Sequence, residues 1–461
     1  MVGFVLEGRV RSPGAHALVD DVARGLASEG FQTHRIEIVP SATPRITHSI
    51  RHAETWVHRN ATAVAAEPAP AAWLDREPTD ECLDLLASQV CDVLQAEGVD
   101  VLHAVGLGLA GRVVRLVHER TGTPYCVTPR WSDLIDRREV SERGRAVLRD
   151  ARHIVLFDED MRRSMEAAFP GRAGDSPLRP RMLRRGVDLE FFKPLPRPER
   201  RNAALRLCRK PELAARLDGI DWERACVVLC VQHEGDTDGF EHLLFALPEL
   251  LHAQPGLVVI VAQLGPPSPA IDSLRAALAG RDPEALYAIL QTSEMYQPLA
   301  DHLDLLHAQG RADAWWTNAA RLEPERRVRF AGEVERDEFA SLLALADVAV
   351  LPGVDPRRSA HVALEALAGG VLPLVREATP AAQVISTIAN EISAEIASLC
   401  VLRNNAPAVR EIEEKLGRIV RLRPELGERL RALAVRKHDV RQTAADLLRL
   451  YGERSGAAVR N

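Results

Sequence analysis

The chain has 461 residues, with 59 basic against 65 acidic side chains and a formal net charge of −6. This length suggests two or three domains with full-sized cores, and the mildly acidic balance argues against broad nucleic-acid binding, so we expect no nucleic-acid partner. Seven cysteines without a CxxC pair argue against a disulfide framework or a zinc site. No apolar run approaches the length of a membrane span, and the N-terminus MVGFVLEGRV lacks a signal-peptide pattern, which predicts a cytoplasmic protein.

Apolar runs and amphipathic helical segments alternate through the first half of the chain. Strands are expected at 3–8, 33–39, 100–106, 124–129 and 151–157, and helices at 16–30, 80–98 and 109–122. Continuous apolar strands that alternate with helices predict a parallel sheet covered on both faces.

A charged segment with three prolines, RRGVDLEFFKPLPRPERR, separates this half from the next and predicts an interdomain linker near Pro194–Pro198. The pattern then restarts, with strands expected at 225–231, 256–262, 327–332, 347–352 and 371–375. The chain is therefore predicted to be α/β, with Rossmann-like, doubly wound domains at 1–195 and 196–440 and a C-terminal helix at 441–461. Ligand should bind where the carboxyl ends of the strands face a cleft.

A long segment, 264–327, interrupts the rhythm of the second half. Its stretches DPEALYAILQ and ADHLDLLHAQG carry helical spacing and capping signals, which predict an inserted helical hairpin or small subdomain. Trp315 and Trp316 either pack the insert down or form an aromatic contact surface, and burial is the more common fate of tryptophan. As a long insertion, the segment is a candidate for acceptor recognition or assembly.

Several short stretches, in the same order along nearly the whole chain, resemble the GT-B retaining glycosyltransferases, in the family that includes sucrose-phosphate synthases and bacterial glucosyl- and mannosyltransferases. RRGVDLEFFKP is similar to the family's "PNGVDLERFXP". RVRFAGEVERDEFASLLALADVAVLPG followed by ALEALAGGVLPLV resembles "VXFLGXVXXXELXXLYXXADVXVLPS…LEAMAXGXPVV". The opening stretch SPGAHALVDDVARGLASEGF resembles the family's glycine loop and first helix, which makes Gly14 a candidate substrate-binding position.

The resemblance implies the GT-B fold, with two domains that face a cleft and a C-terminal helix that crosses back onto the first domain. It also implies a role in carbohydrate biosynthesis. The reaction would be metal-independent transfer of a sugar, with retention, from a nucleotide sugar to an unidentified carbohydrate or lipid-linked acceptor. No cofactor is expected beyond the donor substrate.

Glu365 corresponds to the closing glutamate of the family's E-x7-E motif and by that resemblance contacts the ribose. The opening glutamate is replaced by Arg357, eight positions earlier. The helix that begins in RSAHVALEALAG presents backbone N–H groups suited to a diphosphate, and we assign this role to Ala360, His361 and Val362. Glu365 lies in an otherwise apolar turn, so it requires either solvent or a partner.

Further positions depart from the family pattern. In VQHEGDTDG, aligned on Gly239, His233 takes the place of the family's arginine and Asp238 that of its lysine. Arg130 replaces the histidine of "TPHG" in the first domain. Arg130 and Arg357 are the predicted catalytic cations. His103, at the end of an expected strand, is either a ligand-binding residue or a core histidine with satisfied hydrogen bonds.

These departures leave other hypotheses open. One is a catalytically inactive relative, a pseudoenzyme that acts as a binding or partner subunit. Another is an epimerase or phosphorylase on the same scaffold, since fold alone does not determine chemistry. The basic run LRPRMLRRG is either a peripheral membrane or acceptor-phosphate contact or a solvated edge.

Overall fold

Contacts within the chain divide it into a first unit, Met1–Asp188 with His438–Asn461, and a second unit, Leu189–Lys437. The predicted linker at Pro194–Pro198 therefore lies inside the second unit. The computed structural model describes residues 1–7, 13–39, 45–52, 55–58, 79–130, 133–134, 142–169, 180–207, 211–233, 239–264, 269–322, 327–353, 360–404 and 408–453.

The first unit is built on one eight-stranded sheet with the order β4-β3-β2-β1-β5-β6-β7-β8. The strands from β2 to β8 in this order pair in parallel. The parallel sheet was predicted, but its two-residue edge strand β8 was not. The hairpin formed by β3 and β4 adds an antiparallel edge that sequence analysis missed. The strands are β1 (Val2–Glu7), β2 (Thr33–Val39), β3 (Arg45–His52), β4 (Thr55–His58), β5 (Val101–Val105), β6 (Tyr125–Thr128), β7 (His153–Leu156) and β8 (Arg181–Met182).

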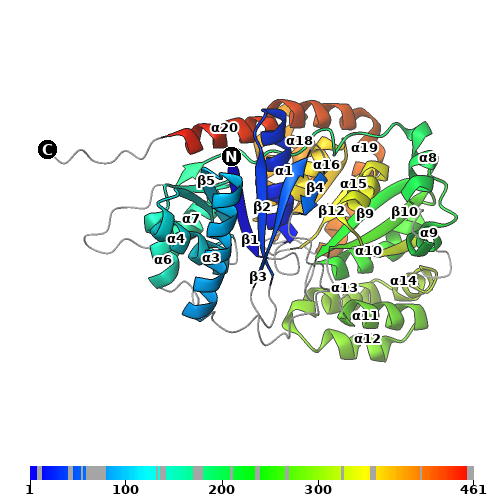
Figure 1. The fold of residues 1–461 in the computed structure, drawn as a ribbon. Coiled ribbons are helices and arrows are strands. Elements are labelled where there is room, and N and C mark those ends of the chain that lie inside the picture. Colours follow the sequence, from blue (N-terminus) through cyan, green and yellow to red (C-terminus); the bar gives the residue numbers. More distant parts are fainter. Residues whose placement is uncertain are drawn as a thin grey trace. The chain divides into compact units, whose positions relative to one another are not determined.

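Helices cover both faces of this sheet (Figure 1). On one face, α1 (Pro13–Ser28) packs against α20 (Val440–Gly452), and both contribute to a buried cluster with the sheet. The other face is covered by α3 (Asp80–Glu97), α4 (Leu109–Thr121), α6 (Glu142–Asp150) and α7 (Glu159–Ala168).

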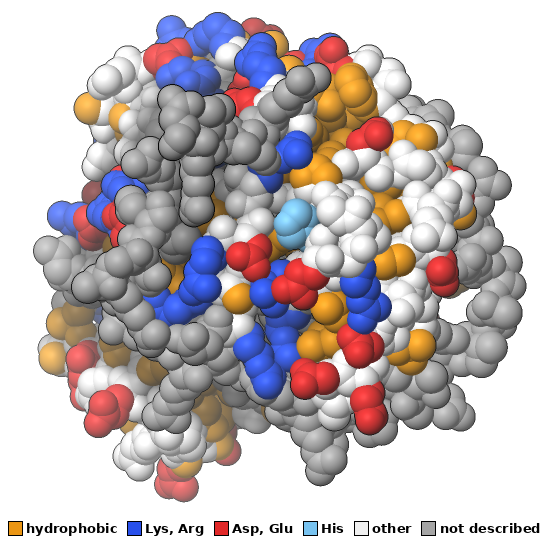
Figure 2. Space-filling model, turned by 60° about the vertical axis from the view of Figure 1, so that its left-hand side comes forward, with side chains coloured by type: hydrophobic (Ala, Val, Ile, Leu, Met, Phe, Trp, Pro, Cys, Tyr) orange, Lys and Arg blue, Asp and Glu red, His pale blue; other side chains and the backbone are white. Residues whose placement is uncertain are grey.

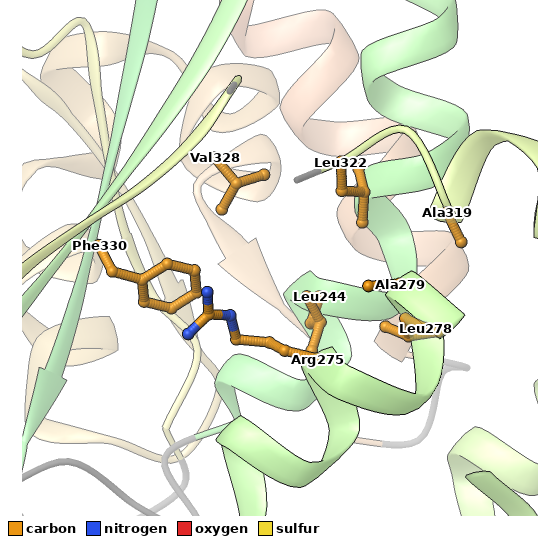
Figure 3. Close-up of a pocket in the computed structure, with 8 residues that line it drawn as sticks. All are labelled: Leu244, Arg275, Leu278, Ala279, Ala319, Leu322, Val328 and Phe330. Atoms are coloured by element: carbon orange, nitrogen blue, oxygen red, sulfur yellow. The ribbon is translucent and has the colours of Figure 1, made fainter. Parts of the chain in front are cut away.

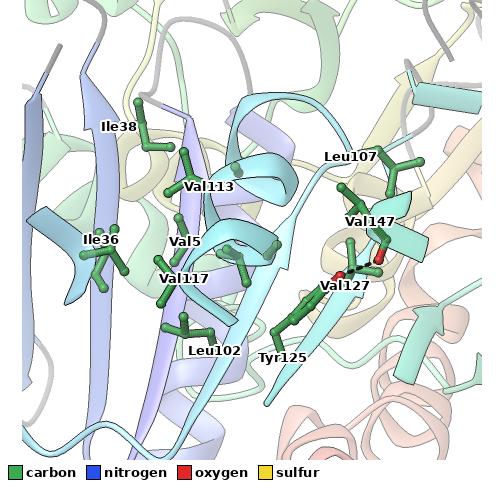
Figure 4. Close-up of a cluster of buried hydrophobic side chains, with 14 of the residues drawn as sticks. Val5, Ile36, Ile38, Leu102, Leu107, Val113, Val117, Tyr125, Val127 and Val147 are labelled. Atoms are coloured by element: carbon green, nitrogen blue, oxygen red, sulfur yellow. Dashed lines mark hydrogen bonds between the residues drawn. The ribbon is translucent and has the colours of Figure 1, made fainter. Parts of the chain in front are cut away.

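Figure 4 shows the core under this second set of helices. Val113 and Val117 of α4 point toward Val5 and Leu102 of the sheet, and all four residues are fully buried. The Tyr125 hydroxyl donates a 2.7 Å hydrogen bond to the carbonyl of Val147, which satisfies the one polar atom that this aromatic side chain brings into the core.

The second unit is built on a six-stranded sheet with the order β11-β10-β9-β12-β13-β14, in which every pairing is parallel. The chain runs outward from β9 to β11 and then returns to the other side of β9, so the sheet has its switch point between β9 and β12. The strands are β9 (Cys226–His233), β10 (Leu257–Leu264), β11 (Val328–Glu333), β12 (Val348–Leu351), β13 (Leu372–Arg376) and β14 (Val401–Leu402).

The helices that surround this sheet include the two that frame the candidate site, α10 (Phe240–Ala253) and α16 (Ala360–Ala368). The others are α8 (Arg197–Leu207), α9 (Pro211–Leu217), α15 (Arg336–Leu345), α17 (Pro380–Ile392), α18 (Ala394–Leu399) and the long α19 (Ala408–Lys437).

The described part of the insert, 269–322, forms four α-helices grouped beside α10 (Figure 1), which matches the predicted small subdomain rather than the hairpin. They are α11 (Pro269–Gly280), α12 (Pro283–Leu290), α13 (Gln297–Ala308) and α14 (Ala312–Ala319). Trp315 is fully buried, packs on Phe245 of α10 at 5.6 Å between ring centroids, and donates its indole N–H to the Phe245 carbonyl at 3.2 Å. Trp316 is 6% exposed. The packing alternative is therefore confirmed for both tryptophans, and the aromatic contact surface is wrong.

Candidate functional site

The candidate site lies at the carboxyl edge of the second unit's sheet, at its switch point. Gly239 caps α10 with φ of 74°, a left-handed conformation that favours glycine. A Cβ atom at this position would lie 2.3 Å from the carbonyl oxygen of Pro352, which follows β12. The ends of the two connections, β9 to α10 and β12 to α16, therefore touch here with no room for a side chain.

The N-terminus of α16 opens onto the same edge. Ala360, His361 and Val362 form its first turn, where backbone N–H groups have no acceptor within the helix. The helix ends at Ala368 and is followed by a turn in which Gly370 has a φ of 68° and the amide of Gly369 donates to the carbonyl of Glu365 at 2.9 Å. The helix dipole and the amides of the first turn suit an anion, so this geometry is compatible with the predicted diphosphate contact.

Glu365 does not face solvent, because it is 1% exposed. Its Oε1 lies 3.0 Å from Nη1 of Arg336, at the start of α15. The partner that Glu365 requires is thus a cation that sequence analysis did not single out. The Arg336 guanidinium also stacks over the ring of Phe192, 5.2 Å from its centroid.

A second cation at this edge, Arg376, was also missed, although it directly follows an apolar run that predicted a strand. Its Nε donates to Oδ1 of Asn404 at 3.0 Å. Burial lowers the pKa of Arg376, an effect opposed by the nearby carboxylates of Glu411, Glu241 and Glu377. Glu241 lies in the first turn of α10 and is itself 3% exposed, so acid and base are interleaved around the switch point.

For four of the predicted site residues, the structure describes at most the backbone. Asp238 and Arg357 lie outside the described residues. Gly14 belongs to the first turn of α1 and His233 to the end of β9, and their backbones alone are placed.

In the first unit, Arg130 follows β6 and is held by Asp133. The Asp133 carboxylate accepts from the backbone N–H groups of Arg130 at 2.7 Å and of Leu107 at 2.9 Å, and it pairs with the Arg130 guanidinium at 3.3 Å. A Cβ at Gly106 would lie 2.9 Å from Nε of Arg130, so the arginine folds over this glycine. Arg130 is thus fixed at the carboxyl ends of β5 and β6.

His103 is a core histidine in this structure. It is 3% exposed, its Nδ1 lies 2.6 Å from the Tyr451 hydroxyl, and its Nε2 lies 2.9 Å from the Thr128 hydroxyl. Both ring nitrogens therefore have protein partners, which matches the structural alternative given for this residue. Burial lowers its pKa to about 3.

This pKa predicts that the first unit loses stability in acid. Between about pH 6.5 and pH 3 the unfolded histidine binds a proton that the folded one rejects, so stability is complete above this window and falls as the pH drops through it. The expected slope is about 1.4 kcal/mol per pH unit for one such histidine. Urea unfolding from pH 7 to pH 5 measures it, and a His103→Gln variant with an unchanged slope would refute the assignment.

One enclosed pocket and the charged surface elsewhere do not provide a nucleotide site. The pocket in Figure 3 has a volume of about 10 Å³, room for about one water molecule, and cannot hold a nucleotide. The face drawn in Figure 2 intersperses basic and acidic side chains. In the basic run, Arg181 pairs with Glu453 at 2.8 Å. Within the described ranges, no group of three or more His, Cys, Asp or Glu side chains is placed to hold a metal ion.

No helix in the described part of the chain is long and apolar enough to cross a bilayer.

Comparison with known proteins gives matches at the level of structure. No protein-family model and no curated protein sequence matches the chain. Sucrose-phosphate synthase from Thermosynechococcus elongatus is 16% identical with a TM-score of 0.59, and the alignment covers 98% of each chain. Anabaena Alr3699/HepE, solved with UDP and glucose, is 15% identical with a TM-score of 0.56, covering 97% of this chain and 99% of that one. The catalytic domain of starch synthase IV from Arabidopsis thaliana, bound to ADP and acarbose, is 10% identical with a TM-score of 0.57, covering 98% of each. These end-to-end likenesses confirm the predicted two-domain α/β architecture.

Proposed function

From the GT-B fold of this chain, we propose that it is a glycosyltransferase that moves a sugar from a nucleoside diphosphate sugar to a carbohydrate or lipid-linked acceptor, with retention. The observation that carries the proposal is the switch point of the second unit, where the start of α16 and the buried Glu365 share one edge of the sheet. Solved proteins of this fold bind UDP-glucose in one case and UDP-2-fluoro glucose in another, which supports a nucleotide sugar as donor.

In the proposed reaction, the amides of Ala360, His361 and Val362 bind the diphosphate and Glu365 binds the ribose. Negative charge develops on the departing diphosphate, and preorganised donors stabilise it, each commonly worth roughly 10²–10³ in rate. Arg357 and Arg376 supply positive charge on the nucleotide side, and Arg130 is assigned to the sugar. Amides and arginines take the part of a metal ion, so no cofactor is proposed.

A binding protein without transferase activity is the second candidate, and one specific feature favours it. Asp238 stands where the family has a lysine, and a carboxylate beside a diphosphate repels it. Nucleotide binding without release of sugar or nucleoside diphosphate in the presence of acceptors would favour this alternative.

The proposed ribose contact predicts that Glu365→Ala weakens nucleoside diphosphate binding by about 1–3 kcal/mol, because hydrogen bonds to the ribose are lost. Isothermal titration calorimetry with UDP, GDP and ADP measures this change in affinity. Glu395→Ala is the matched control, since Glu395 also pairs with an arginine, Arg418 at 2.9 Å, but is 76% exposed. Equal affinities in wild type and Glu365→Ala would remove Glu365 from the site.

A further inference from the structure

We propose that Arg336 is a positioning residue that holds the Glu365 carboxylate ionised and oriented, so that the site selects ligands with an intact ribose diol. This inference rests on the proposed function, because it concerns the same nucleotide site. It assigns to Arg336 a role that acts through Glu365, without requiring the guanidinium to touch the nucleotide.

Glu365 is almost completely buried. Its side chain is 2% exposed, and a carboxylate at that depth is strongly disfavoured as an ion unless a cation compensates it. Arg336 supplies that cation at 3.0 Å and remains 21% exposed itself. An ionised carboxylate can accept several hydrogen bonds at the same time, and the hydroxyl groups of a ribose are donors that suit it.

Arg336 is itself held in place. Its guanidinium carbon lies 5.2 Å from the ring centroid of Phe192 and 5.7 Å from that of Phe191. Phe192 is 2% exposed and packs on Phe339 of α15 at 6.5 Å. Arginine suits this position because its planar guanidinium can stack on a ring and donate to a carboxylate at the same time.

The first turn of α15 is fixed as well. Glu335 and Glu338 form a capping box around the start of this helix, with the Glu335 amide donating to the Glu338 carboxylate at 2.8 Å. Arg336 therefore extends from a fixed backbone, stacks on the buried ring of Phe192, and pairs with the carboxylate of Glu365. The arrangement orients the carboxylate before any ligand arrives, which lowers the cost of binding.

The experiment compares a ligand that has the ribose diol with one that lacks the 2′-hydroxyl, and uses pyrophosphate to measure binding of the phosphates alone. Calorimetry on the full chain uses the nucleoside diphosphate that binds best, its 2′-deoxy analogue, and pyrophosphate. Wild type should prefer the ribose form over the deoxy form by about tenfold or more, because the deoxy analogue lacks a hydroxyl group that can donate a hydrogen bond to the charged carboxylate. Arg336→Met should reduce this preference to less than about threefold and leave pyrophosphate affinity unchanged. Arg336→Lys should retain part of it.

A double variant tests whether Arg336 acts through Glu365. Once Glu365→Gln is present, adding Arg336→Met should cause no further loss of preference, because the carboxylate that Arg336 positions is already gone. Arg275→Met is the matched control, since Arg275 also stacks on a phenyl ring, that of Phe330 at 3.6 Å, and it should keep the full preference. Circular dichroism verifies folding, and Arg336→Lys keeps a cation beside the buried carboxylate.

Two results would overturn the inference while leaving the proposed function intact. One is an Arg336→Met protein that keeps the full ribose preference while Glu365→Gln loses it. The other is additive loss in the double variant, which would give Arg336 a contact of its own. Failure of the wild type to bind any nucleoside diphosphate is a different outcome, because it would refute the proposed function and this inference together.

Discussion

Replacing Trp315 with alanine is expected to destabilise the second unit by about 3–5 kcal/mol, the usual cost of deleting a large buried aromatic side chain. Trp315 is fully buried and joins the insert to α10 through the ring of Phe245 and through its indole hydrogen bond to the Phe245 carbonyl. Urea unfolding followed by circular dichroism measures the loss.

Two further variants separate the causes. Trp315→Phe keeps an aromatic ring and should lose less, mainly the hydrogen bond at about 1 kcal/mol and part of the packing. Met295→Ala, in the same insert but 46% exposed, should change stability by less than about 0.5 kcal/mol. A Trp315→Ala protein as stable as wild type would mean that the insert folds independently of α10 and could be removed without harm.

Gly239→Ala is expected to lower stability and to weaken nucleotide binding together. The left-handed backbone costs an alanine about 1–2 kcal/mol, and forcing a Cβ to within 2.3 Å of the Pro352 carbonyl adds about 1–3 kcal/mol or moves the two connections apart. Since these connections flank the proposed diphosphate site, their separation should reduce nucleoside diphosphate affinity. Thermal unfolding and calorimetry on the same protein measure both effects.

Gly310→Ala provides the control for the backbone conformation. Gly310 also has a left-handed φ, 66°, but no atom lies within 4 Å of its added Cβ. This variant should show the conformational cost alone and normal nucleotide binding. If the Gly239 and Gly310 variants lose equal stability and both bind nucleotide normally, the close contact between Gly239 and the Pro352 carbonyl is not needed for nucleotide binding.

Most parallel strands of both sheets could be predicted because they are largely buried and read as apolar runs. The two-residue strands β8, which is exposed, and β14 could not be predicted. The β3–β4 hairpin could not be predicted either. Its strand RITHSIRH mixes isoleucine with arginine and histidine, since an edge hairpin needs few apolar positions. In a single sequence, such a mixed segment cannot be distinguished from the loops around it.

The division of the chain into two units follows contacts between residues that are distant in sequence. Prolines marked Pro194–Pro198 as a linker, whereas the division falls after Asp188. Arg431 explains the difference, because its guanidinium donates to the carbonyls of Leu189 and Phe192, each at 2.7 Å, and so binds this stretch to the second unit. Because Arg431 is so distant in sequence, these contacts could not be predicted from the residues around Leu189 and Phe192.

The same limit applies to the candidate site. The sequence indicated that Glu365 needs a partner, because a carboxylate in an apolar turn is costly, but it could not identify Arg336 as that partner. The ion pair depends on how the fold places the start of α15 near α16, which no periodicity encodes. His103 shows the same limit. Its two hydrogen bonds reach Thr128 and Tyr451, which are distant in sequence and are brought together only by the fold.

The central claim is that the second unit binds a nucleoside diphosphate at the start of α16. Calorimetric titration of UDP, GDP and ADP, and of their glucose derivatives, into the full-length chain tests it most directly. We predict that one base is preferred, that binding has one site per chain, and that Glu365→Ala weakens it while Glu395→Ala does not. If none of these nucleotides or nucleotide sugars binds, the claim is contradicted.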